Sequence, residues 1–280
     1  MADASARSAL RDALPALVIL ALLAAVPLVA QWLGQPFIVK VATRVVIFAI
    51  AATALNFIVG FGGLVSLCHA GLFGIGGYVV GILAWHDFNA EPLWFLPGTS
   101  NLVVALPAAA LFCAFVSAIV GAISLRTSGP YFLMITLAFN QMFYYGAVAL
   151  QKYGGEDGLQ IMSTMTLGPI DVSNRYRFFY LALFFLALTL FLIGHFVSSR
   201  FGMVLRAASK NEIRVVSVGL DPWIYRLVAF VISGVLTGIA GALLAAGQQF
   251  ISPVDMGWDR SGDLVVMAVL GGVGVVWGPA

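Results

Sequence analysis

Five polar residues stand inside long apolar stretches of the chain and are the first candidates for functional chemistry: Asn56, Ser66, His69, Thr136 and Asn140. Amide, hydroxyl and imidazole groups in such surroundings have two common uses. They line a path for a polar solute, or they form hydrogen bonds between neighbouring helices, which contribute about 0.6 to 2 kcal/mol each. For each residue taken singly we favour the bond between helices, and we keep all five as candidates for a pathway lining.

His69 is the titratable member of this set, but the apolar stretches hold no group to exchange a proton with it. All 12 acidic residues lie outside these stretches or at their edges, which counts against a proton-coupled carrier. The chain also lacks a G-x-x-x-x-G-K-[ST] phosphate loop, a nucleophile elbow and an H-E-x-x-H pair. We therefore expect no enzyme. Either the chain is a passive channel, or the energy for movement comes from another polypeptide.

A basic segment at residues 198–222 is the second candidate, because it is the one long cationic stretch that could form a helix in a strongly apolar chain. Helical spacing places Arg206, Lys210 and Arg214 on one face. It gathers an apolar stripe on another face, made of Val204, Ala207, Ala208, Val215 and Val218.

This segment predicts one amphipathic helix over 203–218, broken before Gly219 and followed at Asp221 and Pro222 by the next apolar stretch. Such a helix binds either anionic lipid headgroups or a protein partner. From the pattern alone the two are equally favoured.

The elements that must position these residues are those of a membrane protein. Hydrophobic residues make up 61% of the 280 and charged residues only 9%, and the mean hydropathy is +1.02. Soluble domains have about a quarter of their residues charged. At about 20 residues per span, we predict an all-α, polytopic bundle of about eight transmembrane helices, forming a single domain over residues 1–280. The predicted spans are 13–33, 37–59, 64–85, 102–124, 131–150, 178–198, 223–246 and 264–280.

Both ends of the chain carry an expectation. Arg7 and Arg11 precede an apolar run, as in a cleavable signal peptide, but the run is longer than the apolar region of a signal. A retained first span is therefore favoured. The last predicted span stops at Ala280, and we expect it to be incomplete.

Cysteines and net charge add little. Cys68 and Cys113 fall inside predicted spans, where free cysteines behave as small apolar residues, so neither a disulfide nor a metal site is expected. With so few residues outside the membrane, the slight excess of basic residues gives no warrant for nucleic-acid binding.

Lysine and arginine positions predict the orientation. With a cytoplasmic N-terminus, the cytoplasmic segments hold Arg7, Arg11, Arg126, Arg200, Arg206, Lys210, Arg214 and Arg226. The outer loops, including a long one at 151–177, hold only Lys152, Arg175, Arg177 and Arg260. Lys40 and Arg44 lie one turn apart near the outer end of the second span and can extend outward. This asymmetry favours the cytoplasmic N-terminus. Eight acidic residues then face outside: Asp87, Glu91, Glu156, Asp157, Asp171, Asp255, Asp259 and Asp263.

Glycines mark two unusual stretches. Residues 60–81 hold eight glycines in 22 positions. We do not expect such a flexible backbone to face lipid, because backbone N–H and C=O groups without hydrogen-bond partners are costly there. The stretch is shielded by other helices or lines a cavity, and it could be re-entrant. A second cluster at 271–274 interrupts the last predicted span. Glycine-interrupted segments in both halves of a membrane protein point to a pathway at the midplane, although tight helix packing also selects glycine.

Tight packing is the favoured interpretation of a third set. Gly234, Gly238 and Gly241 recur with Ala245 along the predicted span 223–246. A continuous stripe of small residues lets a second helix approach closely.

Several stretches together form a specific set that covers most of the chain in order. They are GFGGLVSLCHAGLFGIGGY at 60–78, SGPYFLMITLAFNQM at 128–142, GGEDGL at 154–159, the block 201–245, SP at 252–253 and LGGVGVVWGPA at 270–280. By this set the chain resembles the permease subunits of branched-chain amino acid ABC transporters, most closely the LivM type.

The resemblance implies a permease of the bacterial inner membrane that works with several partners. These are a homologous second permease subunit, two cytoplasmic ATPase subunits and a periplasmic substrate-binding protein. ATP and Mg²⁺ would be held by the ATPase subunits, and no cofactor by this chain. The implied substrate is a branched-chain, hydrophobic amino acid. Related permeases handle urea or short amides, which stay open, as does a stand-alone channel.

The resemblance also implies that the segment 199–222 couples the permease to its ATPase. The coupling residues would be Arg206, Lys210, Asn211, Glu212, Arg214 and Gly219. This chain departs from the pattern at Arg214 and Val215, where small residues commonly follow Glu-Ile, so we expect the segment to seat differently on its partner. Relatives usually continue beyond the Gly-Pro-Ala at 278–280.

Overall fold

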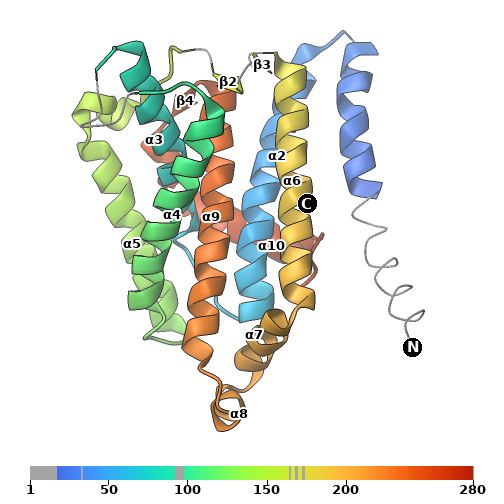
Figure 1. The fold of residues 1–280 in the computed structure, drawn as a ribbon, viewed down its shortest axis with the longest axis vertical. Helices are drawn as coiled ribbons and strands as arrows, with labels where there is room; N and C mark the ends of the chain where they lie inside the picture. The colour runs from blue at the N-terminus through green and yellow to red at the C-terminus, as the bar shows by residue number, and fades with distance from the viewer. Residues whose placement is uncertain are drawn as a thin grey trace.

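The fold is a bundle of long helices that run side by side along one axis (Figure 1). The computed structural model describes residues 18–32, 34–91, 98–163, 165–167, 170–171 and 174–279. Arg7, Arg11 and the start of the first predicted span therefore lie outside the described residues. Within the described part, five helices are long and apolar enough to cross a membrane. They are α2 (Pro36–Asn56) with its continuation, α4 (Leu102–Ser124), α5 (Pro130–Ala149), α6 (Arg175–Ser198) and α9 (Pro222–Gln248).

Polar side chains explain where three of these helices begin. Asn101, Asn174 and Asp221 each accept a hydrogen bond from the backbone N–H two residues later, which satisfies a donor that the helix itself leaves free. The five crossing helices agree with predicted spans to within a few residues. A shorter apolar helix, Val18–Trp32, precedes them. The multi-pass helical bundle is thus confirmed.

α9 packs against α2, α3 (His69–Phe88) and α4 and forms the centre of the bundle (Figure 1). Its glycines make this packing possible. A Cβ atom on Gly234 or Gly238 would collide with Ser117 or Cys113 of α4, and one on Gly241 would collide with the backbone of α3 at Phe73. The three glycines assigned to packing thus lie where helices approach closely.

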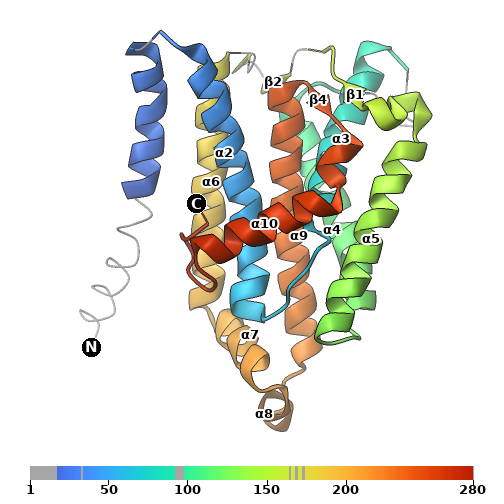
Figure 2. The same ribbon diagram turned by 180° about the vertical axis from the view of Figure 1, so that it is seen from behind.

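The predicted span 64–85 is wrong in its first residues, because the helix found there, α3, begins only at His69. α2 continues into a short π-helix, η1 (Phe57–Gly62), which ends at Gly63 in the left-handed region with φ of 67°. Residues 63–68 then form no helix, and they turn back into the bundle before α3 begins (Figure 2). The left-handed glycine ends the helix, so α3 starts inside the bundle rather than at its edge.

The last predicted span, 264–280, is also wrong. α10 (Trp258–Gly271) lies across the long helices instead of along them (Figure 2). It follows β4 (Phe250–Ile251) and η4 (Pro253–Met256). Glycines with positive φ at 272 and 274 stop it. The predicted count of about eight spans is therefore not confirmed.

The two ends of the bundle differ. α7 (Arg200–Lys210) and α8 (Glu212–Ser217) extend beyond the long helices at one end, here called the α7–α8 end (Figure 1). The opposite end, here called the loop end, carries η2 (Gln151–Tyr153) and η3 (Gly155–Asp157).

Four two-residue strands are the departure from an all-α fold among the described residues. At the loop end, β1 (Leu159–Gln160) pairs antiparallel with β4, and β2 (Thr166–Leu167) pairs antiparallel with β3 (Ile170–Asp171).

Candidate functional site

At the start of α3, in the middle of the bundle, polar side chains of α5 and α10 bond to the backbone. This cluster is here called the polar crossing. A helix that starts in apolar surroundings must find partners for its free N–H groups. Here the N–H of Gly71 donates to Asn140 Oδ1 at 2.7 Å, and the N–H of Ala70 donates to Ser261 Oγ at 3.2 Å. The N–H of Leu67 donates to Thr136 Oγ1 at 3.2 Å. Side chains of α5 and α10 thus replace the missing turn of α3.

Asn140 and Ser261 also fix α10 at the same depth. Asn140 Nδ2 donates to the carbonyl of Met256 at 2.8 Å, and Ser261 Oγ donates to the carbonyl of Leu67 at 2.7 Å. Asn140 lies ten residues after Pro130 and nine before Ala149 in α5. At 1.5 Å per residue it is about 15 Å from each end of that helix, which is the midplane of a hydrocarbon core about 30 Å thick.

His69 ties three elements together beside this crossing. Its Nε2 lies 2.8 Å from Ser233 Oγ in α9, its Nδ1 lies 3.2 Å from Ser66 Oγ, and Ser233 Oγ donates to the carbonyl of Ala54 in α2. Because Ser233 gives its hydroxyl proton to a carbonyl, we assign the imidazole proton to Nε2, which leaves Nδ1 to accept from Ser66. The ring of Phe230 packs edge-on against the imidazole.

Asn56 holds the C-terminal turn against the end of α2. Its Nδ2 donates to the carbonyl of Val275 at 2.7 Å, and its Oδ1 accepts from the N–H of Gly274 at 3.3 Å. Both halves of the amide are therefore used by one turn of backbone more than 200 residues away. A Cβ atom on Gly60 would collide with this turn.

All five predicted pathway residues are thus at most 1% exposed, and each is hydrogen-bonded. Four of them, Ser66, His69, Thr136 and Asn140, meet around the start of α3, whereas Asn56 lies at the other side of η1. In this conformation they hold helices together, and their contact with a solute stays a prediction.

Two partners in this network were missed by sequence reasoning. Ser233 directly precedes the small-residue stripe of α9 and was not among the five predicted residues, although it is also a polar residue inside a predicted span. Ser261 sits in the run DRSGD at 259–263, which was assigned to an outer loop because of its charges.

The predicted coupling segment, residues 199–222, consists of two helices, not the single helix predicted over 203–218. Asn211 has an extended backbone with φ of −155° and ψ of 96°, and its side chain accepts from the N–H of Arg214 at 3.1 Å. Asn211 is thus the N-cap of α8. Asn is among the residues preferred at this position, and helical spacing alone does not show it. The predicted break before Gly219 is confirmed, since α8 ends at Ser217 and Gly219 has φ of 85°.

Two charged residues of this segment bind within the chain. Arg206 Nη2 donates to the carbonyl of Val197 at 3.0 Å, at the end of α6. Glu212 accepts from Arg226 Nη1 at 2.9 Å, and Arg226 Nη2 also donates to the carbonyl of Ala208. Arg206 and Glu212 therefore fix the position of α7 and α8 on the bundle.

The outward surface of the segment is formed by other residues. Lys210 and Arg214 are exposed, and so are Ile213 (82%) and Val218 (78%). Of the predicted apolar stripe, Ala208 and Val215 are buried, whereas Ala207 and Val218 are exposed and Val204 is half-buried. The stripe is divided because the break at Asn211 changes the direction of the chain. A groove of about 400 Å³ lies between α7 and α8, bordered by Met203, Lys210, Asn211 and Val218.

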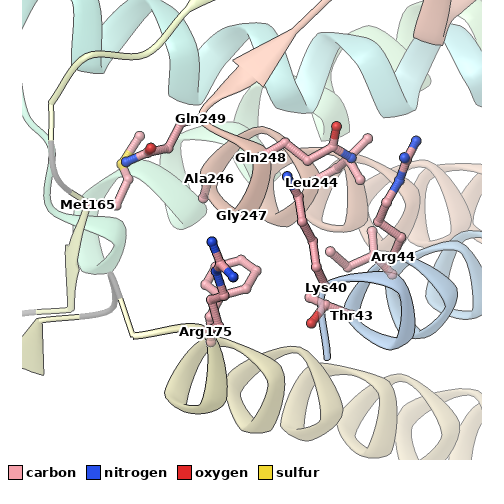
Figure 3. A pocket seen from close by; sticks show the side chains of 12 residues that line it. Lys40, Thr43, Arg44, Met165, Arg175, Leu244, Ala246, Gly247, Gln248 and Gln249 are labelled. Atoms are coloured by element: carbon pink, nitrogen blue, oxygen red, sulfur yellow. The ribbon is translucent and has the colours of Figure 1, made fainter. Parts of the chain in front are cut away.

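A basic pocket of about 360 Å³ lies at the loop end, between α2, α6 and α9 (Figure 3). Lys40, Arg44 and Arg175 line it together with Gln248 and Gln249. Three cations and two amides suit an anionic group such as a carboxylate or a phosphate. The sequence placed these cations near the outer end, but it gave no sign that residues 131 positions apart would meet.

Among the described residues, no group of three or more His, Cys, Asp or Glu side chains could hold a metal ion.

Long apolar helices around a midplane polar crossing, with a polar helical segment beyond one end, define a multi-pass integral membrane protein. The family of permease components of branched-chain amino acid transport systems matches residues 37–280, and the chain belongs to that family.

Two curated relatives are the high-affinity branched-chain amino acid transport system permease proteins LivM of Escherichia coli (strain K12) and of Salmonella typhimurium (strain LT2). Each is 30% identical over 260 residues, which is 84% of this chain and 59% of the relative. The chain thus spans about three fifths of the length of these relatives. A probable branched-chain amino acid transport permease protein LivH of Methanocaldococcus jannaschii is 31% identical over 83 residues, 29% of this chain and 24% of its own length. No solved structure matches the chain.

Proposed function

We propose that this chain is a permease subunit of an ATP-driven importer that carries branched-chain, hydrophobic amino acids across the bacterial inner membrane. The observation that carries the proposal is the joint presence of family membership and a helical segment beyond one end of the bundle. Relatives described as permeases of branched-chain amino acid transport systems support the substrate class. Exposed apolar residues on α8 support a protein partner at that end, because water-exposed Ile213 gains by being covered.

The proposed partners follow from what this chain would need. An ATPase subunit docks on the coupling segment 199–222, a second ATPase docks on a homologous second permease, and a periplasmic binding protein delivers the substrate to the loop end. ATP and Mg²⁺ belong to the ATPase subunits, and this chain, a single domain over 1–280, binds no cofactor and catalyses no reaction. Exposed Lys210, Asn211, Arg214 and Gly219 would contact the ATPase directly, whereas Arg206 and Glu212 would hold the segment in place.

The orientation we propose has the α7–α8 end and the N-terminus in the cytoplasm. The α7–α8 end carries Arg206, Lys210, Arg214 and Arg226, and cytoplasmic segments of membrane proteins are enriched in such residues. The long loop 151–177 then lies outside.

Coupling would pass from α7 into the bundle through direct contacts. α7 packs against η1, and Leu205 of α7 reaches Gly62. η1 is joined to the C-terminal turn through Asn56 and to the start of α3 through residues 63–68. A movement of α7 on ATP binding would therefore act at once on α3 and on α10. The polar pathway candidates Ser66, His69, Thr136 and Asn140 lie where those two elements meet.

Reconstitution tests the proposal. The chain is assembled in proteoliposomes with its ATPase, its companion permease and its binding protein. ATP hydrolysis is then measured with leucine, urea or acetamide added as the substrate. We expect severalfold stimulation by leucine and none by the other two. Stimulation by urea or acetamide alone would move the substrate to the amide class, and solute flux without any ATPase would establish a stand-alone channel instead.

A further inference from the structure

Three charged residues at the start of α10 lie at the midplane of the bundle. Asp259, Arg260 and Asp263 flank Ser261, whose hydroxyl bonds the carbonyl of Leu67 and lies 3.5 Å from Asn140 Oδ1. Asn140 marks the middle of α5, so Ser261 lies at a depth about 15 Å from either end of that helix, and the three charged residues are its neighbours in the chain. The sequence predicted an outer loop at these residues, whereas in the structure they begin α10 beside the segment that leads into α3.

The two carboxylates lie on the exposed side of α10, whereas Arg260 is partly buried. Ser261, Leu264 and Ala268 form the buried side of α10, at most 2% exposed. On the other side, Asp259 is exposed, the side chain of Asp263 is 60% exposed, and that of Arg260 is 35% exposed. Figure 2 shows α10 in front of α2 and α9 along the surface of the bundle.

One face of α10 therefore changes from charged to apolar along its length. Helical spacing puts Asp259, Asp263, Val266 and Leu270 on this face, here called the α10 stripe. Val266 is 55% exposed and Leu270 is 82% exposed. Arg260 borders the charged half, with Nη1 3.9 Å from Asp263 Oδ2.

Contact with lipid would be unfavourable for the charged half of the stripe, which holds Asp259 and Asp263. Ionised side chains at the centre of a bilayer are costly, and those that occur face a bundle interior or a water-filled cavity. One cation beside two carboxylates also leaves an uncompensated negative charge. Contact with water or with a ligand that carries a positive charge would therefore be more favourable for the charged half than contact with lipid.

We propose that the α10 stripe is a wall of the water-filled substrate path and binds a zwitterionic amino acid. Asp259 and Asp263 take the ammonium group, Arg260 takes the carboxylate, and Val266 receives the aliphatic side chain. Asp263 and Val266 are three residues apart, about 4.5 Å along the helix axis, which matches the span from the ammonium to the side chain of leucine. This inference rests on the proposed function and adds the residues that select a charged amino acid over urea or an amide.

Thiol labelling tests whether water reaches the stripe. Val266→Cys is compared with Phe112→Cys, a matched control that is also apolar, half-exposed and at the middle of its helix, α4. The native Cys68 and Cys113 are fully buried and give the blank. In the assembled transporter in vesicles, a charged, membrane-impermeant methanethiosulfonate should label Val266→Cys at least tenfold faster than Phe112→Cys, and leucine should slow that labelling. Equal rates at the two positions would overturn the proposal, because the stripe would then face lipid or a dry contact with the second permease.

Ligand selectivity tests the carboxylates. Asp263→Asn in the Val266→Cys background should raise at least tenfold the leucine concentration that half-protects the thiol, whereas Asp157→Asn, an exposed loop carboxylate, should leave it unchanged. Asp263→Glu should recover most of the protection. Unchanged protection in Asp263→Asn would sink the ammonium site. Leucine-stimulated ATP hydrolysis in the unmodified assembly, measured in parallel, reports on the proposed function separately, so either idea can fail while the other stands.

Discussion

Gly63 and Ser209 lie against each other where the connection between η1 and α3 crosses α7: a Cβ atom on Gly63 would stand 3.0 Å from Cβ of Ser209. This contact joins the proposed coupling segment to the segment that leads into the polar crossing. Gly63 also needs its left-handed backbone, with φ of 67°, to turn the chain back into the bundle. The position therefore combines a conformational need with a steric one.

Replacing Gly63 with Ala should separate those two needs when Gly34→Ala is the control. Gly34 also has a positive φ, 64°, but nothing lies within 4 Å of its Cβ position. Both variants should lose about 1 to 2 kcal/mol of stability from the left-handed backbone, measured as lower thermal midpoints. Only Gly63→Ala should also reduce substrate-stimulated ATP hydrolysis severalfold, because its methyl group displaces α7. Adding Ser209→Gly should restore that stimulation, and equal hydrolysis in the two single variants would contradict the coupling route.

The exposed tip of α8 gives the second prediction. Ile213→Asp should weaken copurification of the ATPase at least tenfold, since it puts a charge where we expect an apolar contact, while leaving the thermal midpoint of the isolated chain within about 1 °C because Ile213 is 82% exposed. Glu212→Gln should lower the thermal midpoint of the isolated chain slightly and leave most of the copurification intact. It breaks the 2.9 Å pair with Arg226, costs about 1 kcal/mol or less, and affects docking only indirectly. Full copurification with Ile213→Asp would exclude the tip as the docking surface.

The crossing helices could be predicted well because their boundaries are set by residues close to them in the sequence. Asn101 and Asp221 cap α4 and α9, and Pro222 begins α9, so apolar length and capping residues agree. The charge pattern predicted helical structure in the proposed coupling segment, but it did not predict the break at Asn211. An amphipathic periodicity is nearly unchanged by one extended residue, so only the capping preference of Asn could have shown it.

The depth of α10 was beyond reach for a different reason. Charged residues are normally excluded from the membrane, so Asp259 and Asp263 were read as an outer loop. What holds them at the midplane is the Ser261 hydroxyl on the carbonyl of Leu67, 194 residues away. The pairing of His69 with Ser233 spans 164 residues. Such distant partners leave no periodic signal in a single sequence.

Asn140 gives a third prediction, on stability. Asn140→Leu should remove the acceptor of the Gly71 N–H and the donor to the Met256 carbonyl. Two buried backbone groups left without partners should cost about 2 to 4 kcal/mol, seen as a clear fall in the thermal midpoint in nanodiscs. The neighbouring Gln141→Leu is the matched control, since Gln141 is half-buried and lies on another face of α5. Similar midpoints for the two variants would mean that water replaces the Asn140 bonds.

The fourth prediction concerns pH and a cluster at the loop end. The ammonium of Lys152 donates to Glu91 at 2.9 Å and lies 4.9 Å from the centre of the Trp85 ring. This hydrogen bond lowers the pKa of the Glu91 carboxyl below its ordinary 4.5 and raises the pKa of Lys152 above its ordinary 10.5. The stabilisation from a lowered carboxyl pKa is complete above the ordinary pKa and is lost as the pH falls through the lowered one. The stabilisation from a raised ammonium pKa is complete below 10.5.

The pair should therefore contribute constantly between pH 5 and 9 and lose its effect in acid. We expect the thermal midpoint of the unmodified chain to exceed that of Glu91→Gln by a small, constant amount across that range, and the difference to shrink toward zero below about pH 4.5. Both groups are exposed, so 0.5 M salt should reduce the difference as well. Lys152→Gln should show the same pH profile as Glu91→Gln, because either change removes the same bond. A difference that stays constant or grows on acidification would show that Glu91 acts through some contact other than Lys152.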